Sequence, residues 1–195
     1  MDAACAAWDA LIVAGGRGTR LGGVSKPALM LGDRTLLDRT LDAVTGATRT
    51  VLVGGPRRDG VLWTVEEPAG AGPAAAVGAG LDALARDAYR EGQDPAPWTV
   101  VVAVDLPGLA RGIGRMLDAR AQDGAWLVDA GGRPQALLAV YRTQALAARC
   151  EDTMDGWSMR RLVEGLRMVA VPDVRDASHD VDTWDDVELW KGRLA

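Results

Sequence analysis

Apolar positions along this chain follow two patterns. Short apolar runs rich in β-branched residues predict buried strands at residues 8–14, 50–53, 61–65, 98–104, 125–128, 135–141 and 168–171. Between them, apolar residues at helical spacing predict helices near residues 36–44, 73–89, 113–121, 143–150, 158–166 and 183–194. Strands that are apolar throughout and separated by helices are typical of a mainly parallel sheet covered on both faces. The pattern therefore predicts an α/β protein with three layers.

The predicted topology also indicates where a ligand would bind. In open α/β sheets, ligands bind beyond the carboxyl ends of the parallel strands. The first predicted strand runs into a glycine-rich loop, and the strand at 98–104 ends at Asp105. We therefore expect the loop and Asp105 to meet in one cleft.

Composition narrows the classes of function. The 195 residues suffice for one domain, 1–195, with a full core, and 48% of them are apolar. A net charge of −5 and a pI of about 4.9 argue against nucleic acid as a partner. No apolar run approaches the ~20 residues of a membrane span, and the acidic N-terminus does not resemble a signal peptide. Cys5 and Cys150 lie far apart, which indicates reduced thiols, so we expect a cytoplasmic protein.

The glycine-rich loop carries the first candidate chemistry. Residues 11–27 hold five glycines, two arginines and Lys26. Glycine lets the backbone approach a ligand closely, and converging N–H groups favour anionic oxygens. A P-loop is excluded because Ser25 and Pro27 flank Lys26, and Leu21 stands where a dinucleotide fingerprint needs its third glycine. The loop predicts binding of a small anion such as a triphosphate, with a flexible surface turn as the alternative.

Acidic residues form two further candidate sites. Asp105 ends an apolar strand, where it can bind a hard cation such as Mg²⁺ or cap the following helix. Beside a triphosphate loop we favour the metal. Alternation along an extended segment puts Asp180 and Asp182 on the same side, and Asp182 also lies where a helix is expected to start.

The loop resembles the signature of nucleotidyltransferases, which transfer a nucleoside monophosphate from an NTP and release pyrophosphate. The matching residues are Ala14, Gly15, Gly16, Gly18, Arg20, Gly22, Lys26 and Pro27. Two later segments, 132–142 and 156–162, resemble the molybdenum cofactor guanylyltransferase family within that superfamily. The resemblance covers about residues 10–189. It implies a Rossmann-like fold of the nucleotide-diphospho-sugar transferase type.

The resemblance also implies a reaction and its residues. GMP would pass from GTP to molybdenum–molybdopterin with Mg²⁺ as cofactor, giving the guanine dinucleotide cofactor and pyrophosphate. The implied catalytic residues are Arg20, Lys26 and Asp105, and the implied metal ligands are Asp105 and, second, Asp182. The implied nucleotide-binding residues are Val13, Ala14, Gly15, Gly16, Gly18, Lys26, Gly54, Glu67 and Asp105. The implied pterin-binding residues are Arg133, Gln135, Ser158, Arg160 and Asp180.

Some positions depart from the family pattern, and they keep other functions open. Aspartates stand at 180 and 182 where the family commonly has asparagines, and Ser25 replaces a frequent aspartate. Many members also have an asparagine near the position of Gly54 that reads the base, and Gly54 has no side chain to do so. Asp-x-Asp-Thr is frequent in related pterin cytidylyltransferases, so a molybdopterin cytidylyltransferase or another NTP transferase is one alternative. A catalytically silent nucleotide-binding accessory protein, serving a molybdoenzyme or its chaperone, is an alternative of another class.

Overall fold

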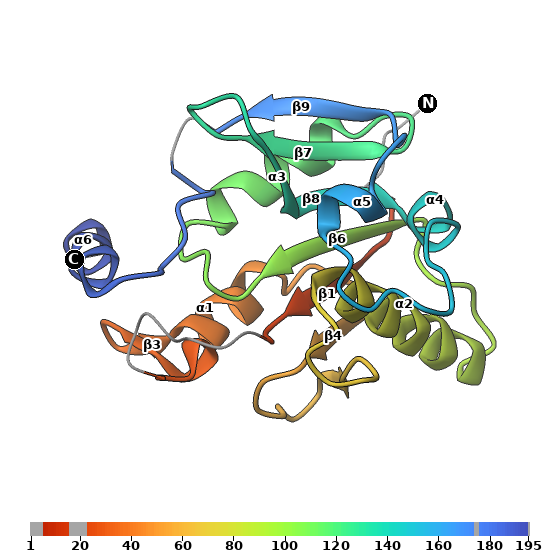
Figure 1. The fold of residues 1–195 in the computed structure, drawn as a ribbon, viewed down its shortest axis with the longest axis horizontal. Helices are drawn as coiled ribbons and strands as arrows, with labels where there is room; N and C mark the ends of the chain where they lie inside the picture. The colour runs from red at the N-terminus through yellow and green to blue at the C-terminus, as the bar shows by residue number, and fades with distance from the viewer. Residues whose placement is uncertain (1–5, 16–22, 174–175, 195) are drawn as a thin grey trace.

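A computed structural model describes residues 6–15, 23–173 and 176–194 (Figure 1). Its elements in chain order are β1 (Trp8–Val13), the 3₁₀ helix η2 (Lys26–Ala28), β2 (Met30–Leu31), β3 (Arg34–Thr35), α1 (Leu36–Ala43), β4 (Thr50–Val53), β5 (Leu62–Thr64), α2 (Pro73–Arg90), β6 (Trp98–Ala103), α3 (Ala110–Ala119), β7 (Gly124–Val128), β8 (Pro134–Arg142), α4 (Thr143–Ala147), α5 (Met159–Leu162), β9 (Met168–Pro172) and α6 (Trp184–Leu194).

The central sheet has the strand order β5-β4-β1-β6-β8. Neighbouring strands are parallel except β8, which runs antiparallel to β6. The parallel pair β7 and β9 lies beside β8 along the upper edge in Figure 1. The lack of a side chain at Gly124 allows the start of β7 to lie close to β8. A Cβ at this position would lie only 2.1 Å from the carbonyl oxygen of Val140. The expected mainly parallel sheet is confirmed.

Alternate residues of the strands enter two different cores. In β1, Ile12 packs in the core that includes Leu37 of α1 and Met116 of α3. Its neighbour Leu11 packs in the opposite core with Val77 of α2. Side chains of α4 and α5 join this second core. Helices therefore cover both faces of the sheet, and the predicted three-layer architecture is confirmed.

Several element boundaries differ from the sequence expectations. The hairpin of β2 and β3 was not expected, because strands of two residues are too short to show a period. Helix α3 begins at Ala110, three residues before the expected start. Helix α5 ends at Leu162 rather than near residue 166, and Gly165, with φ +83°, lies in the turn that follows. In the described part of the chain, no helix combines the length and apolar character needed to cross a membrane.

Asp9 is a buried carboxylate inside β1. Its Oδ1 accepts a hydrogen bond from the N–H of Arg49 at 3.1 Å, and its Oδ2 accepts one from the N–H of Ala96 at 3.0 Å. Burial raises the pKa of Asp9, while these hydrogen bonds act to lower it. The side chain thus ties the entries of β4 and β6 to β1.

We predict that Asp9→Ala lowers the free energy of unfolding by about 2–4 kcal/mol, because it leaves two buried N–H donors without an acceptor, at about 1–3 kcal/mol each. Urea unfolding of both proteins measures this difference. Asp94→Ala, at an exposed position, is the control and should change stability by less than about 0.5 kcal/mol. Equal stabilities of the two variants would contradict the role given to Asp9.

Candidate functional site

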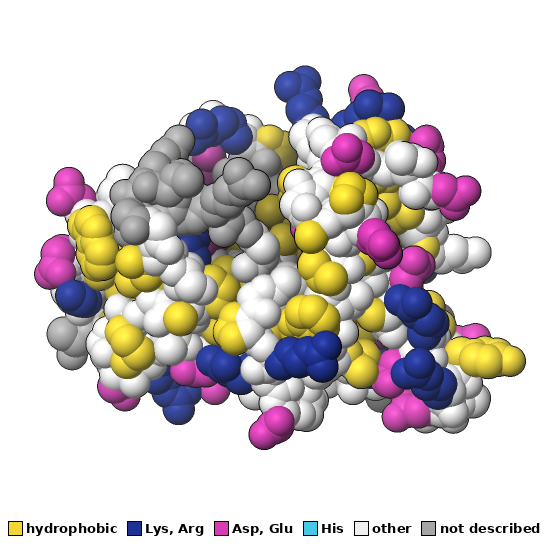
Figure 2. Space-filling model, turned by 60° about the horizontal axis from the view of Figure 1, so that its bottom comes forward, with side chains coloured by type: hydrophobic (Ala, Val, Ile, Leu, Met, Phe, Trp, Pro, Cys, Tyr) yellow, Lys and Arg dark blue, Asp and Glu magenta, His cyan; other side chains and the backbone are white. Residues whose placement is uncertain are grey.

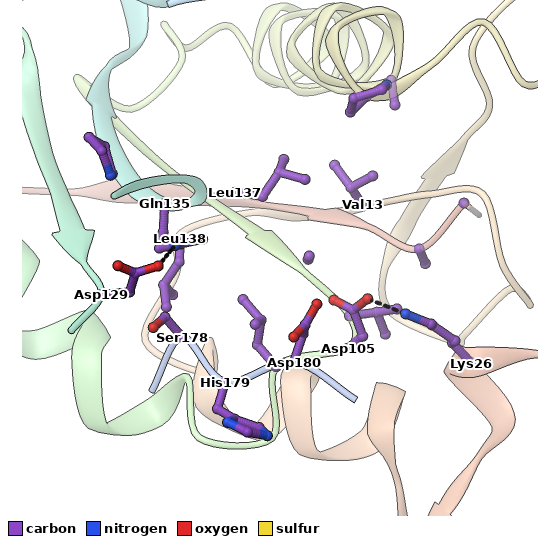
Figure 3. A pocket seen from close by; sticks show the side chains of 18 of the residues that line it. Val13, Lys26, Asp105, Asp129, Gln135, Leu137, Leu138, Ser178, His179 and Asp180 are labelled. Atoms are coloured by element: carbon purple, nitrogen blue, oxygen red, sulfur yellow. Dashed lines mark hydrogen bonds and ion pairs between the residues drawn. The ribbon is translucent and has the colours of Figure 1, made fainter. Parts of the chain in front are cut away.

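A cleft of about 1160 Å³ opens at the carboxyl ends of β1 and β6. Figure 3 shows its two ends. At one end lie Lys26, Asp105 and Asp180, and at the other lie Asp129 and Gln135. The position agrees with the expectation that the first loop and Asp105 meet in one cleft.

Backbone hydrogen bonds fix the strand ends that form this cleft. The N–H of Val104 donates to the carbonyl of Val13 at 3.1 Å, and the N–H of Ala14 donates to the carbonyl of Val53 at 2.9 Å. Gly54 follows β4 with φ +74°, and a Cβ there would lie 3.1 Å from the nitrogen of Gly15. The positive φ and this close approach both favour glycine, so the backbone of Gly54 packs directly against Gly15 in the loop that follows β1.

Lys26 connects the first loop with two distant carboxylates. It begins the 3₁₀ helix η2, in which Pro27 is buried. Its Nζ lies 2.7 Å from Oδ2 of Asp105 and 2.5 Å from Oδ1 of Asp182. The Lys26–Asp105 contact is drawn in Figure 3. One ammonium group therefore joins chain segments that are 79 and 156 residues apart.

Three carboxylates gather around this lysine. Asp105, Asp180 and Asp182 each offer an oxygen atom, and these atoms lie within 4.8 Å of one another. The N–H of Val181 donates to the carbonyl of Asp105 at 2.9 Å, which fixes the segment between the two later aspartates. Asp180 and Asp182 thus turn the same way, as the alternation predicted. The structure adds Asp180 to the pair proposed from the sequence.

The electrostatics of this cluster favour a further cation. Burial acts to lower the pKa of Lys26, but the hydrogen bonds from Lys26 to Asp105 and Asp182 outweigh it and raise that pKa. Loss of hydration, followed by the charges of Asp182 and Asp105, raises the pKa of Asp180. Three carboxylates against one ammonium leave two negative charges when all are ionised. Clustered carboxylate oxygens suit a divalent ion such as Mg²⁺.

A cap at the start of α6 holds the segment that carries Asp182. The carboxylate of Asp186 accepts hydrogen bonds from the N–H of Asp182 at 3.1 Å and from the N–H of Thr183 at 2.8 Å. The Thr183 hydroxyl donates to the same oxygen at 2.7 Å. These bonds, led by that of Thr183, lower the pKa of Asp186 to about 2. Capping therefore falls to Thr183 and Asp186, and the carboxylate of Asp182 turns to Lys26.

On the side of the cleft nearest α2, the lining acid is Glu66 and not the neighbouring Glu67 that the sequence predicted. Glu66 lines the cleft, is 8% exposed, and accepts a hydrogen bond from the N–H of Gly70 at 2.9 Å. Glu67, proposed from the sequence, is exposed and is not among the described residues that line the cleft. Gly72 and Pro73 also line it, so the N-terminus of the 18-residue helix α2 faces this end. A helix N-terminus favours anionic groups.

The end of the cleft that contains Asp129 brings together only some of the expected pterin-binding residues. Arg133 and Gln135 line it. His179 also lines the cleft, and its Nε2 lies 3.2 Å from Oδ1 of Asp186. Ser158 and Arg160 are not among the described lining residues. Ser158 instead caps α5, where its hydroxyl accepts a hydrogen bond from the N–H of Arg161 at 3.3 Å.

Part of the predicted site cannot be placed. Gly16, Gly18 and Arg20, expected to bind phosphate or to stabilise charge, lie outside the described residues. Of the expected nucleotide-binding residues that the structure describes, Val13, Ala14, Gly15, Lys26 and Asp105 line the cleft.

Asp129 and Glu66 line the cleft but were not proposed from the sequence, and the two differ in the signal that could have found them. Asp129 comes directly after the apolar strand β7, and Asp105 comes two residues after β6, so a similar pattern could have found Asp129. Glu66 had no such signal, because it and Glu67 follow β5 as adjacent identical residues.

Charge on the outer surface is mixed. On the face shown in Figure 2, Lys and Arg side chains are interspersed with Asp and Glu. The described side chains of this face therefore form no continuous basic stripe of the kind that a nucleic-acid backbone favours.

Comparisons with known proteins point to one family. Residues 10–171 match the family described as "MobA-like NTP transferase domain". The chain is 32% identical over 191 residues to a protein of Acidiphilium cryptum named molybdenum cofactor guanylyltransferase, covering 92% of this chain and 91% of that protein.

Solved structures share the fold. Molybdopterin-guanine dinucleotide biosynthesis protein A from Archaeoglobus fulgidus matches with a TM-score of 0.69 at 20% identity, over 95% of this chain and 98% of that one. The 2-C-methyl-D-erythritol 4-phosphate cytidylyltransferase from Thermus thermophilus matches with a TM-score of 0.65 at 20% identity, over 94% and 97%. At such identities the likeness concerns the fold alone, and it confirms the expected Rossmann-like nucleotidyltransferase type.

We predict that Lys26→Ala increases the affinity of the nucleotide-free protein for a divalent cation. The variant frees two carboxylates from an ammonium at 2.5–2.7 Å. Two partly exposed ion pairs of about 0.5–1 kcal/mol each correspond to roughly a tenfold gain. Calorimetric titration with Mn²⁺ measures it. Lys26→Arg, which keeps the charge, is the control, and unchanged Mn²⁺ affinity in Lys26→Ala would contradict competition between lysine and metal.

Proposed function

The chain belongs to the MobA-like NTP transferase family, and from this premise we propose that it transfers GMP from GTP to molybdenum–molybdopterin. The products would be the guanine dinucleotide cofactor and pyrophosphate. The observation that carries the proposal is the convergence of Lys26, Asp105, Asp180 and Asp182 at the strand ends of a two-ended cleft. The named relative at 32% identity supports the choice of reaction.

In this proposal the triphosphate lies between the glycine-rich loop that follows β1 and the N-terminus of α2. Backbone N–H groups from Gly15 onward, including those of Gly16 and Gly18, would bind phosphate oxygens. Gly54 supports the loop by its close approach to Gly15. The guanine base would lie near the 66–73 segment. There Glu66, on the cleft, is a better placed acceptor for guanine N–H groups than Glu67.

The acidic cluster fits a divalent metal ion by its donor set. Asp105, Asp180 and Asp182 would hold Mg²⁺, with the remaining ligands supplied by phosphate oxygens and water. When bound, the ion would neutralise charge on the triphosphate. These assignments extend the two ligands expected from the sequence by Asp180.

The chemical step is a displacement at phosphorus. An oxygen of the acceptor's terminal phosphate attacks the α-phosphorus of GTP, and the bond from that phosphorus to the bridging oxygen breaks, so that pyrophosphate leaves with the electron pair. No general base is needed, because the attacking phosphate is already an anion. Lys26 and Arg20 would stabilise charge on the α-phosphate and on the leaving group. For Lys26 this requires that its ammonium move from the carboxylates to the phosphate.

The acceptor would occupy the end of the cleft that contains Asp129, away from Lys26 (Figure 3). Arg133 and Gln135 lie there and would contact the acceptor, whereas Ser158 caps α5 and Arg160 lies on that helix, and we give neither a contact. We also propose a cytoplasmic location, which agrees with the free thiol of Cys150.

We predict that, among the four NTPs with Mg²⁺, GTP alone raises the melting temperature. A ligand that binds only the native state raises apparent stability, by about 2.7 kcal/mol at one hundred times its dissociation constant. Thermal shift measures this directly. A shift with CTP alone would identify a cytidylyltransferase instead, and no shift with any NTP would contradict nucleotide binding.

We predict that Lys26→Ala and Asp105→Asn each lower pyrophosphate release from GTP at least about 100-fold, because each removes a charge that acts on the reacting phosphates. Far-ultraviolet circular dichroism checks that the fold is kept, and Asp59→Asn, on the surface, is the control. Near-normal turnover in either variant would refute its assigned role. GTP binding without pyrophosphate release in the wild type would favour a silent accessory protein.

A further inference from the structure

We infer that Asp129 is a positioning residue that sets the recognition of the acceptor by orienting Gln135 and Arg133. The inference rests on the proposed function, because it concerns the acceptor end of the same cleft. It goes beyond that function by naming the groups that the cleft offers and the side chain that fixes them.

Four hydrogen-bond donors converge on the carboxylate of Asp129. Its Oδ1 accepts from the N–H of Gly131 at 2.8 Å and from the N–H of Arg133 at 3.0 Å. Its Oδ2 accepts from Nε of Arg133 at 3.0 Å and from Nε2 of Gln135 at 3.0 Å. The side chain is only 15% exposed. The hydrogen bond from the N–H of Arg133, followed by others from the same loop, lowers the pKa of Asp129.

This network decides which end of Gln135 faces a ligand. A carboxylate and a carbonyl can only accept, and Gln135 is bound by the carboxylate of Asp129 and, at 3.4 Å, by the carbonyl of Arg133. The amide nitrogen of Gln135 must therefore point toward both of them. Its Oε1 has no hydrogen-bond partner among the described residues and is left to accept one. Figure 3 shows the pair at the end of the cleft away from Lys26.

The same carboxylate binds one nitrogen of the Arg133 guanidinium and leaves the two terminal nitrogens for a ligand. Nε donates to Asp129, while the side chain as a whole is 83% exposed. The terminal nitrogens can therefore donate to a ligand that enters the cleft. The loop thus offers one carbonyl acceptor and one cationic donor. Together these suit an acceptor with a ring N–H or amino group and an anionic substituent, a description that a phosphorylated pterin satisfies.

Asp129 has a matched counterpart at the other end of the same strand. Asp123 precedes β7 as Asp129 follows it. Its Oδ2 accepts from the N–H of Arg167 at 2.9 Å and from Nε of Arg167 at 3.3 Å, and its side chain is 18% exposed. Asp123 is not among the described residues that line the cleft. The two aspartates therefore resemble each other in burial and partners and differ in their relation to the cleft.

The test compares Asp129→Asn with Asp123→Asn in steady-state kinetics of the full chain. Asparagine keeps the size of aspartate but turns an NH₂ group toward N–H donors, which releases Gln135 and Arg133. We expect Asp129→Asn to raise KM for molybdenum–molybdopterin about tenfold, as the loss of about one charge-assisted hydrogen bond would, with KM for GTP unchanged within about twofold. Asp123→Asn should change neither constant.

A double variant tests whether Asp129 acts through Gln135. If it does, Asp129→Asn adds little to the effect of Gln135→Ala, so the two changes together raise KM by less than the product of their separate effects. An unchanged KM for molybdenum–molybdopterin in Asp129→Asn, an equal rise in both KM values, or an effect that multiplies fully with Gln135→Ala would each overturn the inference.

Failure of the proposed function would look different. The wild type would then transfer no GMP to molybdenum–molybdopterin. In that case the same variants are compared by equilibrium binding of molybdenum–molybdopterin. A loss of affinity confined to Asp129→Asn would support the inference, and equal affinities of the wild type and Asp129→Asn would overturn it.

Discussion

The contact of the Lys26 ammonium with the carboxylates of Asp105 and Asp182 joins three distant parts of the chain. Lys26 follows the first loop, Asp105 lies two residues after strand β6, and Asp182 precedes the last helix. Part of each side chain is exposed, at 18%, 21% and 34%, so the two ion pairs contribute little to stability. What they determine is the geometry of the cleft, because they hold its charged groups within reach of one another.

In the proposed reaction, the charges of this contact also explain how one site would accept both a metal ion and a triphosphate. Without a cation, three carboxylates would repel an anionic substrate, and Lys26 compensates only one of their charges. An ammonium held by weak, partly hydrated ion pairs can be exchanged for a divalent ion and passed to a phosphate. Lys26 is thus a resting partner of the acids in the free protein and, in the proposed reaction, a partner of the substrate.

Much of this arrangement could be predicted from the sequence, and the reason is periodicity. The apolar run before Asp105 predicted a buried strand, and parallel strands place their carboxyl ends together. The period of two in extended backbone predicted that Asp180 and Asp182 would turn the same way. Both inferences need only local pattern and the geometry of a parallel sheet.

The rest depended on contacts that no local pattern encodes. Glu66 and Glu67 are adjacent and identical, so only the folded loop decides which one enters the cleft. Ser158 precedes a helix, where capping competes with ligand binding, and in the structure its hydroxyl caps α5. The role inferred for Asp129 arises from a loop that closes on its carboxylate, and these hydrogen bonds depend on the folded positions of Gly131 and Gln135.

The most direct test of this account is the position of the metal and of Lys26 with nucleotide bound. A crystal structure with Mn²⁺ and a non-hydrolysable GTP analogue, in which anomalous scattering locates the metal, would measure both. The account predicts Mn²⁺ among Asp105, Asp180 and Asp182, with Nζ of Lys26 moved onto a phosphate oxygen. Metal bound elsewhere, with Lys26 still paired to Asp105 and Asp182 beside the bound nucleotide, would contradict it.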